Sequence, residues 1–120
     1  MKIKLVTGDT PLIPISITDP ATGLAIDLTA SSILLKVRKL GGTLKASVPC
    51  SLLPGLVLKD DSINYAPPYD VAGKGGRCLA ECDATVFDAA GEYEAEVEVT
   101  TGPVIITTFK IHKFTVREDL

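Results

Sequence analysis

The residue types that most often carry catalysis are sparse in this chain. Among 120 residues there is one histidine, His112, and there is no tryptophan. A Ser/His/Asp system would have only His112 to build on, and no acidic residue stands at a catalytic spacing from it. The glycine-rich stretch 73–76 lacks the spacing and the following helix of a phosphate loop, so it is interpreted as a flexible loop tip. The sequence therefore predicts a protein that is not an enzyme, with no catalytic residue and no cofactor.

Four alternating glutamates form the next candidate site. Every second residue from 92 to 98 is glutamate, and the residues between them are Tyr93, Ala95 and Val97. Because successive strand side chains point to opposite faces, the carboxylates share one face at a spacing of about 6.6 Å. That spacing is too wide for one calcium ion without loop ligands, so no metal site is predicted. We expect a solvated face that discourages edge-to-edge aggregation, and keep as an alternative a negative strip that meets a basic partner.

The segment from Tyr65 to Tyr69 is the best candidate for binding. It carries two tyrosines on a proline-stiffened loop, and tyrosine is enriched among the residues that dominate interface energy. Long loops of compact domains are often functional. An ordinary surface loop that folds its tyrosines inward remains the alternative. The candidate partner-binding residues are Tyr65, Pro67, Pro68, Tyr69 and Lys74.

The three cysteines are Cys50, Cys78 and Cys82, without a Cys-x-x-Cys spacing. If Cys78 and Cys82 share a strand they lie about 13 Å apart, beyond the reach of a disulfide. A bridge from Cys50 to either of them stays open, but buried free thiols are the favoured state in a reducing cytosol.

Alternating apolar runs mark the strands that must position these residues. They cover about 12–19, 31–40, 44–52, 78–86, 92–100 and 104–116. The first run contains Pro14, which has no N–H to donate, so it is expected at a sheet edge. The third run predicts that Leu44 shares a face with Ala46 and Val48. Residues 60–77 break the pattern and are predicted to form a long loop, with a short strand near 63–66.

The last run needs an irregularity. Phe114 and Val116 have the opposite phase from the apolar residues before them, so a bulge near residues 112–113 is expected to return both to the core. Lys110 would then lie on the solvent face, within reach of the glutamates.

The totals describe a single globular domain spanning 1–120. The chain is 46% hydrophobic and 22% charged, with a net charge of −3 and no basic cluster, which argues against nucleic-acid binding. No apolar run is long enough for a signal peptide or a membrane span, so synthesis in the cytosol without membrane association is expected. No run has a helical period, and turns come about every ten residues. These features predict an all-β fold, a single antiparallel β-sandwich of about seven to nine strands.

The pattern Asp88-x-x-Gly91-x-Tyr93 is similar to the tyrosine corner of immunoglobulin-like sandwiches. In that corner a tyrosine near the start of the penultimate strand returns its hydroxyl to nearby backbone. Asp88, Gly91 and Tyr93 are therefore predicted to be structural residues.

With the strands placed, an ordered set of motifs stands out: Gly8-Asp9-Thr10, the turn from Asp19 to Gly23, Asp27-Leu28-Thr29, Val37-Arg38, and Asp88-x-x-Gly91-x-Tyr93 with the Thr101-Gly102 turn. In this order the motifs resemble the immunoglobulin-like N-terminal domain of the phage baseplate upper protein and related short Ig-like proteins of tailed phages. The resemblance covers roughly residues 7–40 and 78–116. Residues 41–77 depart from it, and the family usually continues into a receptor-binding or linker region.

The resemblance implies a structural or adaptor protein of a tailed-phage virion, in the tail, baseplate or fibre attachment. Its partners would be other virion proteins in a symmetric assembly, and it would reach the particle from the host cytoplasm without a signal peptide. The segment Lys2–Val6 could add to a neighbouring sheet. Two alternatives stay open: a capsid decoration or neck protein of the same fold, and a carbohydrate-binding module that stacks sugars on Tyr65 and Tyr69. The scarcity of aromatic residues disfavours a glycan partner.

Overall fold

The structure is a computed structural model that describes residues 2–19, 21–102 and 105–118. Within these ranges, residues 2–3, 105–107 and 109–112 are described by their backbone alone. The protein is all-β, and the described residues contain no helix. Its strands are β1 Lys2–Val6, β2 Leu12–Ser16, β3 Ser31–Lys39, β4 Leu44–Leu53, β5 Leu56–Val57, β6 Ile63–Asn64, β7 Arg77–Glu81, β8 Gly91–Thr101 and β9 Ile105–Arg117.

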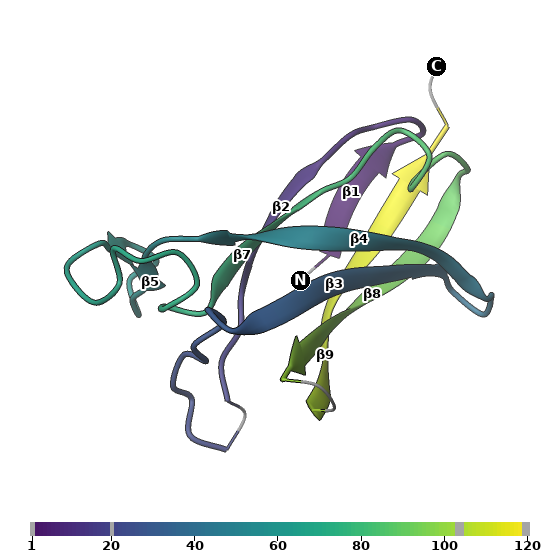
Figure 1. The fold of residues 1–120 in the computed structure, drawn as a ribbon. Helices are drawn as coiled ribbons and strands as arrows, with labels where there is room; N and C mark the ends of the chain where they lie inside the picture. The colour runs from purple at the N-terminus through teal and green to yellow at the C-terminus, as the bar shows by residue number, and fades with distance from the viewer. Residues whose placement is uncertain (1, 20, 103–104, 119–120) are drawn as a thin grey trace.

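Seven of these strands form one curled sheet in the order β1-β9-β8-β3-β4-β7-β2 (Figure 1). All neighbours are antiparallel except β1 and β9, which run parallel. Strand β4 belongs to both halves of the sheet, because its first half pairs with β3 and its second half with β7. The chain thereby turns β7 and β2 over the face of β3, β8 and β9. The prediction that the strand with Pro14 lies at an edge is confirmed, since β2 ends the sheet.

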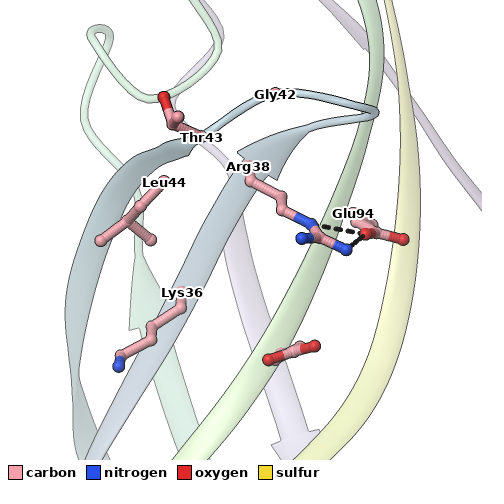
Figure 2. Close-up of a pocket in the computed structure, with 7 residues that line it drawn as sticks. Lys36, Arg38, Gly42, Thr43, Leu44 and Glu94 are labelled. Atoms are coloured by element: carbon pink, nitrogen blue, oxygen red, sulfur yellow. Dashed lines mark hydrogen bonds and ion pairs between the residues drawn. The ribbon is translucent and has the colours of Figure 1, made fainter.

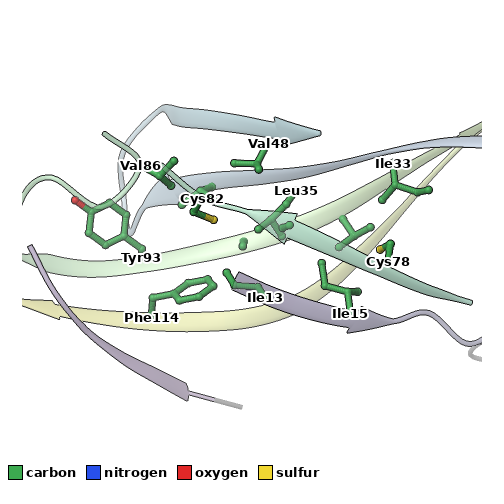
Figure 3. Packing of buried hydrophobic residues seen from close by; sticks show 14 of the residues in the cluster. Ile13, Ile15, Ile33, Leu35, Val48, Cys78, Cys82, Val86, Tyr93 and Phe114 are labelled. Carbon is green, nitrogen blue, oxygen red and sulfur yellow. The ribbon is translucent and has the colours of Figure 1, made fainter. Parts of the chain in front are cut away.

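The concave side of the sheet encloses one apolar core (Figure 3). It contains side chains from strands far apart in the sheet order, such as Ile13 and Ile15 of β2 and Phe114 of β9. Phe87 is fully buried in this core, with its ring centroid 5.4 Å from that of Tyr93 and 4.9 Å from that of Phe114. Alternate residues of β2, β3 and β8 are buried, which confirms the predicted inward faces.

The glutamate face of β8 is less solvated than expected. Glu94 is only 5% exposed, and its carboxylate accepts a hydrogen bond from Nε of Arg38 at 2.6 Å. Lys36 of the same neighbouring strand pairs with Glu98 at 2.6 Å. The prediction of a solvated face is therefore wrong at Glu94, while Glu92 is exposed and Glu96 and Glu98 are half-buried. The neighbouring strand contributes two cations that cover the carboxylates, and the alternation within β8 alone could not reveal them.

Two irregularities redirect side chains. Opposite Val37 and Arg38 the register of β4 shifts by one residue, so that Lys45 is the extra residue of a bulge and Leu44 pairs with Arg38. Leu44 therefore lies on the outer face, 56% exposed, rather than with Ala46 and Val48 as the alternation predicted.

The second shift lies in β9 between Lys110, which pairs with Glu96, and His112, which pairs with Ala95. This shift lies about one residue before the bulge predicted near residues 112–113. Phe114 and Val116 are buried, as that bulge requires. The side chains of Lys110 and His112 lie outside the described residues, so the predicted solvent position of Lys110 does too.

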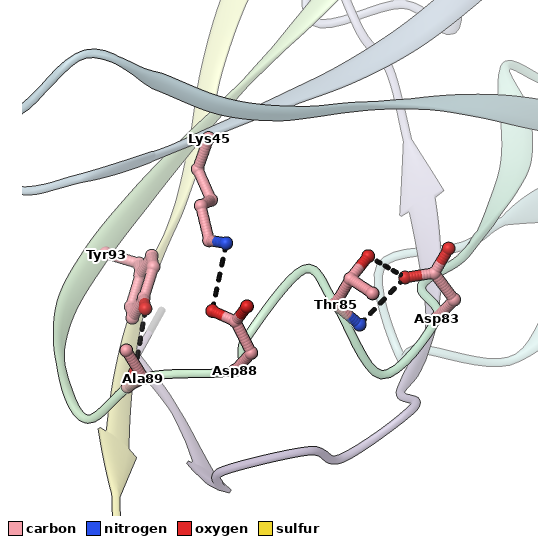
Figure 4. A network of polar contacts seen from close by, with 6 residues as sticks. All are labelled: Lys45, Asp83, Thr85, Asp88, Ala89 and Tyr93. Carbon is pink, nitrogen blue, oxygen red and sulfur yellow. Dashed lines mark hydrogen bonds and ion pairs between the residues drawn. The ribbon is translucent and has the colours of Figure 1, made fainter.

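The segment before β8 makes the hydrogen bond expected of a tyrosine corner (Figure 4). The buried Tyr93 donates its hydroxyl to the carbonyl of Ala89 at 2.7 Å. Asp88 pairs with Lys45 at 2.9 Å, which joins the corner to the bulge of β4. Gly91 has a φ of +144°, a conformation that side-chain-bearing residues avoid, which explains glycine at this position.

Two of the motif residues shape connections between strands. The Asp9 carboxylate accepts a hydrogen bond from the N–H of Val6 at 2.9 Å, and this turn carries the chain from β1 to β2. In the connection from β2 to β3, the Asp27 carboxylate accepts hydrogen bonds from the N–H and hydroxyl of Thr29, at 2.9 and 2.7 Å. Side-chain acceptors of this kind satisfy backbone N–H groups in turns.

Candidate interaction surface

Residues 56–71 form a lobe at one end of the curled sheet, where β5 and β6 make a separate two-stranded hairpin (Figure 1). We call this segment the β5–β6 lobe. It contains most of the predicted loop 60–77, and β6 at Ile63–Asn64 is the short strand expected near 63–66. None of its residues belongs to the buried core cluster.

Backbone hydrogen bonds fasten the base of the lobe to the sheet. The N–H of Gly55 donates to the carbonyl of Tyr69 at 2.7 Å, and the N–H of Gly73 donates to the carbonyl of Leu53 at 2.9 Å. The Arg77 guanidinium donates to the carbonyl of Pro54 at 2.6 Å. The two ends of the lobe therefore leave the sheet side by side, and hydrogen bonds hold the lobe in position at both ends.

The glycine-rich stretch is part of this base. Gly73, Gly75 and Gly76 are buried, which contradicts their interpretation as a loop tip. A Cβ on Gly75 would lie 2.0 Å from the carbonyl oxygen of Gly55, and a Cβ on Gly76 would lie 2.6 Å from that of Ile17. These glycines allow backbone segments to pass in contact, and that requirement depends on partner residues distant in the chain: Gly55, 20 residues earlier than Gly75, and Ile17, 59 residues earlier than Gly76.

Large apolar side chains are exposed on the lobe. Tyr65 is 54% exposed, and three aliphatic residues are also exposed, at 37%, 42% and 49%: Val57, Leu58 and Val71. Val57 pairs with Ile63 in the hairpin, and a Cβ on Gly55 would lie 2.4 Å from the side chain of Ile63 and 3.1 Å from that of Tyr65. The lobe thus presents four exposed apolar side chains on a fastened base.

The predicted binding residues separate into three groups. Tyr65, Pro67 and Pro68 are exposed on the lobe. Tyr69 is half-buried and contributes its carbonyl to the base. Lys74 lies beyond the lobe, where its ammonium pairs with Asp27 at 3.1 Å. The exposed aliphatic residues of the lobe were missed because Val57, Leu58 and Val71 do not stand out in a chain that is 46% hydrophobic.

Ionisable groups near this region are structural. The pKa of Asp27 falls from 3.8 to about 2, because Thr29 donates two hydrogen bonds to the carboxylate and Lys74 lies beside it. Such a shift marks a carboxylate that stays charged, which is not the property of a general acid. Among the described residues no group of three or more His, Cys, Asp or Glu side chains is placed to hold a metal ion.

The three cysteines are free thiols. Cys50 is in register with Ala80, so it lies diagonal to both Cys78 and Cys82, a separation of roughly 7–8 Å between Cα atoms that exceeds the usual reach of a disulfide. A hydrogen bond between the Cys50 and Cys78 thiols raises the pKa of Cys78 and lowers that of Cys50. Burial raises the pKa of Cys82 to about 11. Cys78 and Cys82 are packed in the core as small apolar residues, and the half-buried Cys50 packs against it.

Within the described ranges, no helix has the length and apolar character needed to span a membrane.

No family model and no curated protein matches the chain. Among solved structures, the chain is similar to a family 123 glycoside hydrolase from Clostridium perfringens that hydrolyses glycolipid glycans, with a TM-score of 0.52 and 13% sequence identity. The match covers 100% of this chain and 23% of the enzyme, so the chain spans about a quarter of that enzyme's length. At this identity the similarity is one of fold alone.

Proposed function

We propose that the protein is a non-enzymatic adaptor that binds another protein through the β5–β6 lobe. The observation that carries this proposal is the exposure of four large apolar side chains on one lobe whose base is held by hydrogen bonds at both ends: Tyr65, Val57, Leu58 and Val71. Exposed apolar surface gathered on one part of a folded domain marks interaction sites, and a pre-positioned lobe loses little entropy on binding. The exposed aliphatic residues of the lobe favour a protein partner, because a sugar-stacking platform needs aromatic faces and hydrogen-bonding neighbours.

We further propose an immunoglobulin-like sandwich for the curled sheet. The strand order supports it: β9, β8 and β3 follow one another as G, F and C do in that fold, and β4, β7 and β2 follow one another as D, E and B. The hydrogen bond from Tyr93 to Ala89, at the start of the penultimate strand, also supports it.

The proposed setting is a tailed-phage virion, in the tail, baseplate or fibre attachment, or as a capsid decoration or neck protein. This part of the proposal rests on the ordered motifs shared with phage baseplate Ig-like domains. Several of those motif residues, including Asp9, Asp27 and Tyr93, make the turns and the corner of the fold, so they support the shared architecture most directly.

The test begins with the genes that flank the coding sequence. Their products are expressed, and binding to the purified chain is measured by calorimetry. We expect a tail or baseplate protein to bind, and we expect Tyr65→Ala to weaken binding by about 30-fold or more, the effect of losing an interface hot spot. Leu24→Ser is the matched control, because Leu24 is 69% exposed but lies outside the lobe, and its affinity should equal that of the wild type.

The alternatives give different results. Co-sedimentation with tailless heads would place the protein on the capsid. Binding to a glycan array that disappears in the Tyr65→Ala, Tyr69→Ala double variant would replace the adaptor with a carbohydrate-binding module. Equal losses in Tyr65→Ala and Leu24→Ser would show that the lobe is not the binding surface.

A further inference from the structure

A hollow of about 280 Å³ lies on the outer face of the sheet, on the side opposite to the core (Figure 2). Strands β3 and β8 form its floor and the β3–β4 hairpin forms its lip. It is lined by Lys36, Arg38, Glu94 and Glu96 of the floor and by residues 42–44 of the lip.

The bulge at Lys45 builds this hollow. Because Lys45 is the extra residue, Leu44 pairs with Arg38 and points to the outer face instead of into the core. Leu40, at the other end of the hairpin, is also exposed, at 57%. Bulges often re-aim a side chain next to a functional site. This one supplies an apolar lip to a site with a charged floor.

The charges of the floor are unequally matched. Arg38 donates to Glu94 from both Nε and Nη2, and Lys36 reaches diagonally to Glu98 at 2.6 Å instead of to Glu96 directly opposite. Among the residues whose side chains are described, Glu96 has no ion-pair partner. Among the side chains that the structure describes, the hollow therefore carries two paired cations, Lys36 and Arg38, and one half-buried carboxylate without an ion-pair partner, Glu96.

We propose that this hollow binds one long basic side chain, arginine or lysine, of a protein partner. The inference rests on the proposed adaptor function and names a second contact for it. The cation would meet Glu96, and its aliphatic stem would lie against Leu44, as basic side chains commonly do. Pockets for drug-sized ligands begin at roughly 300 Å³, so the hollow suits one side chain rather than an extended segment.

Other ligands fit the floor less well. An anion would have to compete with Glu94 for Arg38 and with Glu98 for Lys36. A metal ion would need more oxygen ligands than the hollow offers and would meet two cations and a leucine.

The experiment titrates the ¹⁵N-labelled protein with Nα-acetyl-arginine methylamide and with its lysine analogue, following backbone amides by NMR. We expect saturable shifts at Gly42, Thr43 and Leu44 with an affinity in the millimolar range. Glu96→Gln should weaken binding about fivefold or more. Glu92→Gln is the matched control: it removes the same charge from the same strand outside the hollow, and it should bind as the wild type does.

Nα-acetyl-citrulline methylamide is the neutral probe, Nα-acetyl-glutamate methylamide the acidic probe and methyl glucoside the sugar probe. Saturable shifts of the same amides with any of these three, at an affinity equal to that of the arginine probe, would overturn the proposal. So would the absence of saturable shifts with both basic probes, or equal affinities for Glu96→Gln and Glu92→Gln.

Binding of the basic probes in the hollow does not depend on the lobe. Tyr65→Ala should leave binding of the arginine probe unchanged, so a failure of the hollow and a failure of the lobe are seen separately.

Discussion

At the scale of single residues, Tyr93 does two things. Its ring packs edge-on against Phe87 in the core, and its hydroxyl reaches the carbonyl of Ala89, which lies on an exposed segment. The ring therefore contributes apolar burial, while the hydroxyl holds the corner that leads into β8. The two contributions can be separated by substitution.

We expect Tyr93→Phe to lower the free energy of unfolding by about 1 kcal/mol, because the exposed Ala89 carbonyl can accept a hydrogen bond from water instead. Tyr93→Ala should cost about 3–5 kcal/mol, since it leaves a cavity beside Phe87 and Phe114. Urea denaturation at constant pH measures both. Near-neutral results for both variants would show that Tyr93 is not a buried corner residue.

Asp27 makes the free energy of unfolding depend on pH in the acidic range. Its pKa in the folded protein, about 2, is below the ordinary value of 3.8, so the unfolded chain takes up the proton first as the pH falls. The stabilisation is therefore complete above pH 3.8 and is lost as the pH falls through about 2. We expect the difference in free energy of unfolding between wild type and Asp27→Asn to be constant at neutral pH and to shrink over that window. A difference that stays constant down to pH 2 would contradict the assigned hydrogen bonds from Thr29.

At the scale of elements, strand β4 determines the shape of the molecule. Its first half extends the β3–β8–β9 side and its second half pairs with β7, so one strand carries the turn of the whole sheet. Its bulge at Lys45 places Leu44 on the outer face and Lys45 beside Asp88. One extra residue thus shapes both the hollow and the connection to the tyrosine corner.

The crossing at the base of the lobe leaves no room for a Cβ on Gly75, which would lie 2.0 Å from the carbonyl oxygen of Gly55. We expect Gly75→Ala to destabilise the protein by about 3 kcal/mol or more, because the new Cβ would meet the backbone of Gly55, which cannot move aside as a side chain would. Gly23→Ala is the control: a Cβ there meets nothing within 4 Å, and only its φ of +73° is unfavourable, at about 1 kcal/mol. Chemical denaturation of both variants measures the difference, and equal effects would disprove the crossing.

At the scale of the whole molecule, the lobe lies outside the core of the curled sheet. The core cluster takes its residues from the seven-stranded sheet and its connections, and among the described strands β5 and β6 pair only with each other. We therefore expect the sheet to be stable without the lobe, which would free the lobe to carry an interaction surface.

We expect replacement of residues 57–68 by a short Gly-Ser linker to keep a single cooperative unfolding transition with a modest loss of stability. A short linker can span the gap because the two ends of the lobe are close together: the Gly55 N–H donates to the Tyr69 carbonyl at 2.7 Å. Near-UV circular dichroism and thermal denaturation report on the fold. Loss of the cooperative transition would show that the lobe is part of the folding unit, and retained partner binding would remove the lobe from the proposed function.

Alternation by itself determined most of the strands and their inward faces. Ile13 and Ile15, Leu35 and Val37, and Val97 are buried as their spacing predicts, because a strand must send successive side chains to opposite sides. The hydrogen bond of Tyr93 also follows from its local pattern, since the corner spans only four residues. What could be predicted is what depends on neighbours in the chain.

Tertiary structure decided the rest. The burial of Glu94 depends on Arg38, 56 residues earlier; the outward turn of Leu44 depends on the register of β4 against β3; and the burial of Gly75 depends on Gly55. Each is a contact between segments distant in sequence, and a one-residue change of register reverses a face without changing the local pattern. The strands of this protein were therefore determined by its sequence periods, while the placement of its β5–β6 lobe and of its hollow was decided by how those strands pair.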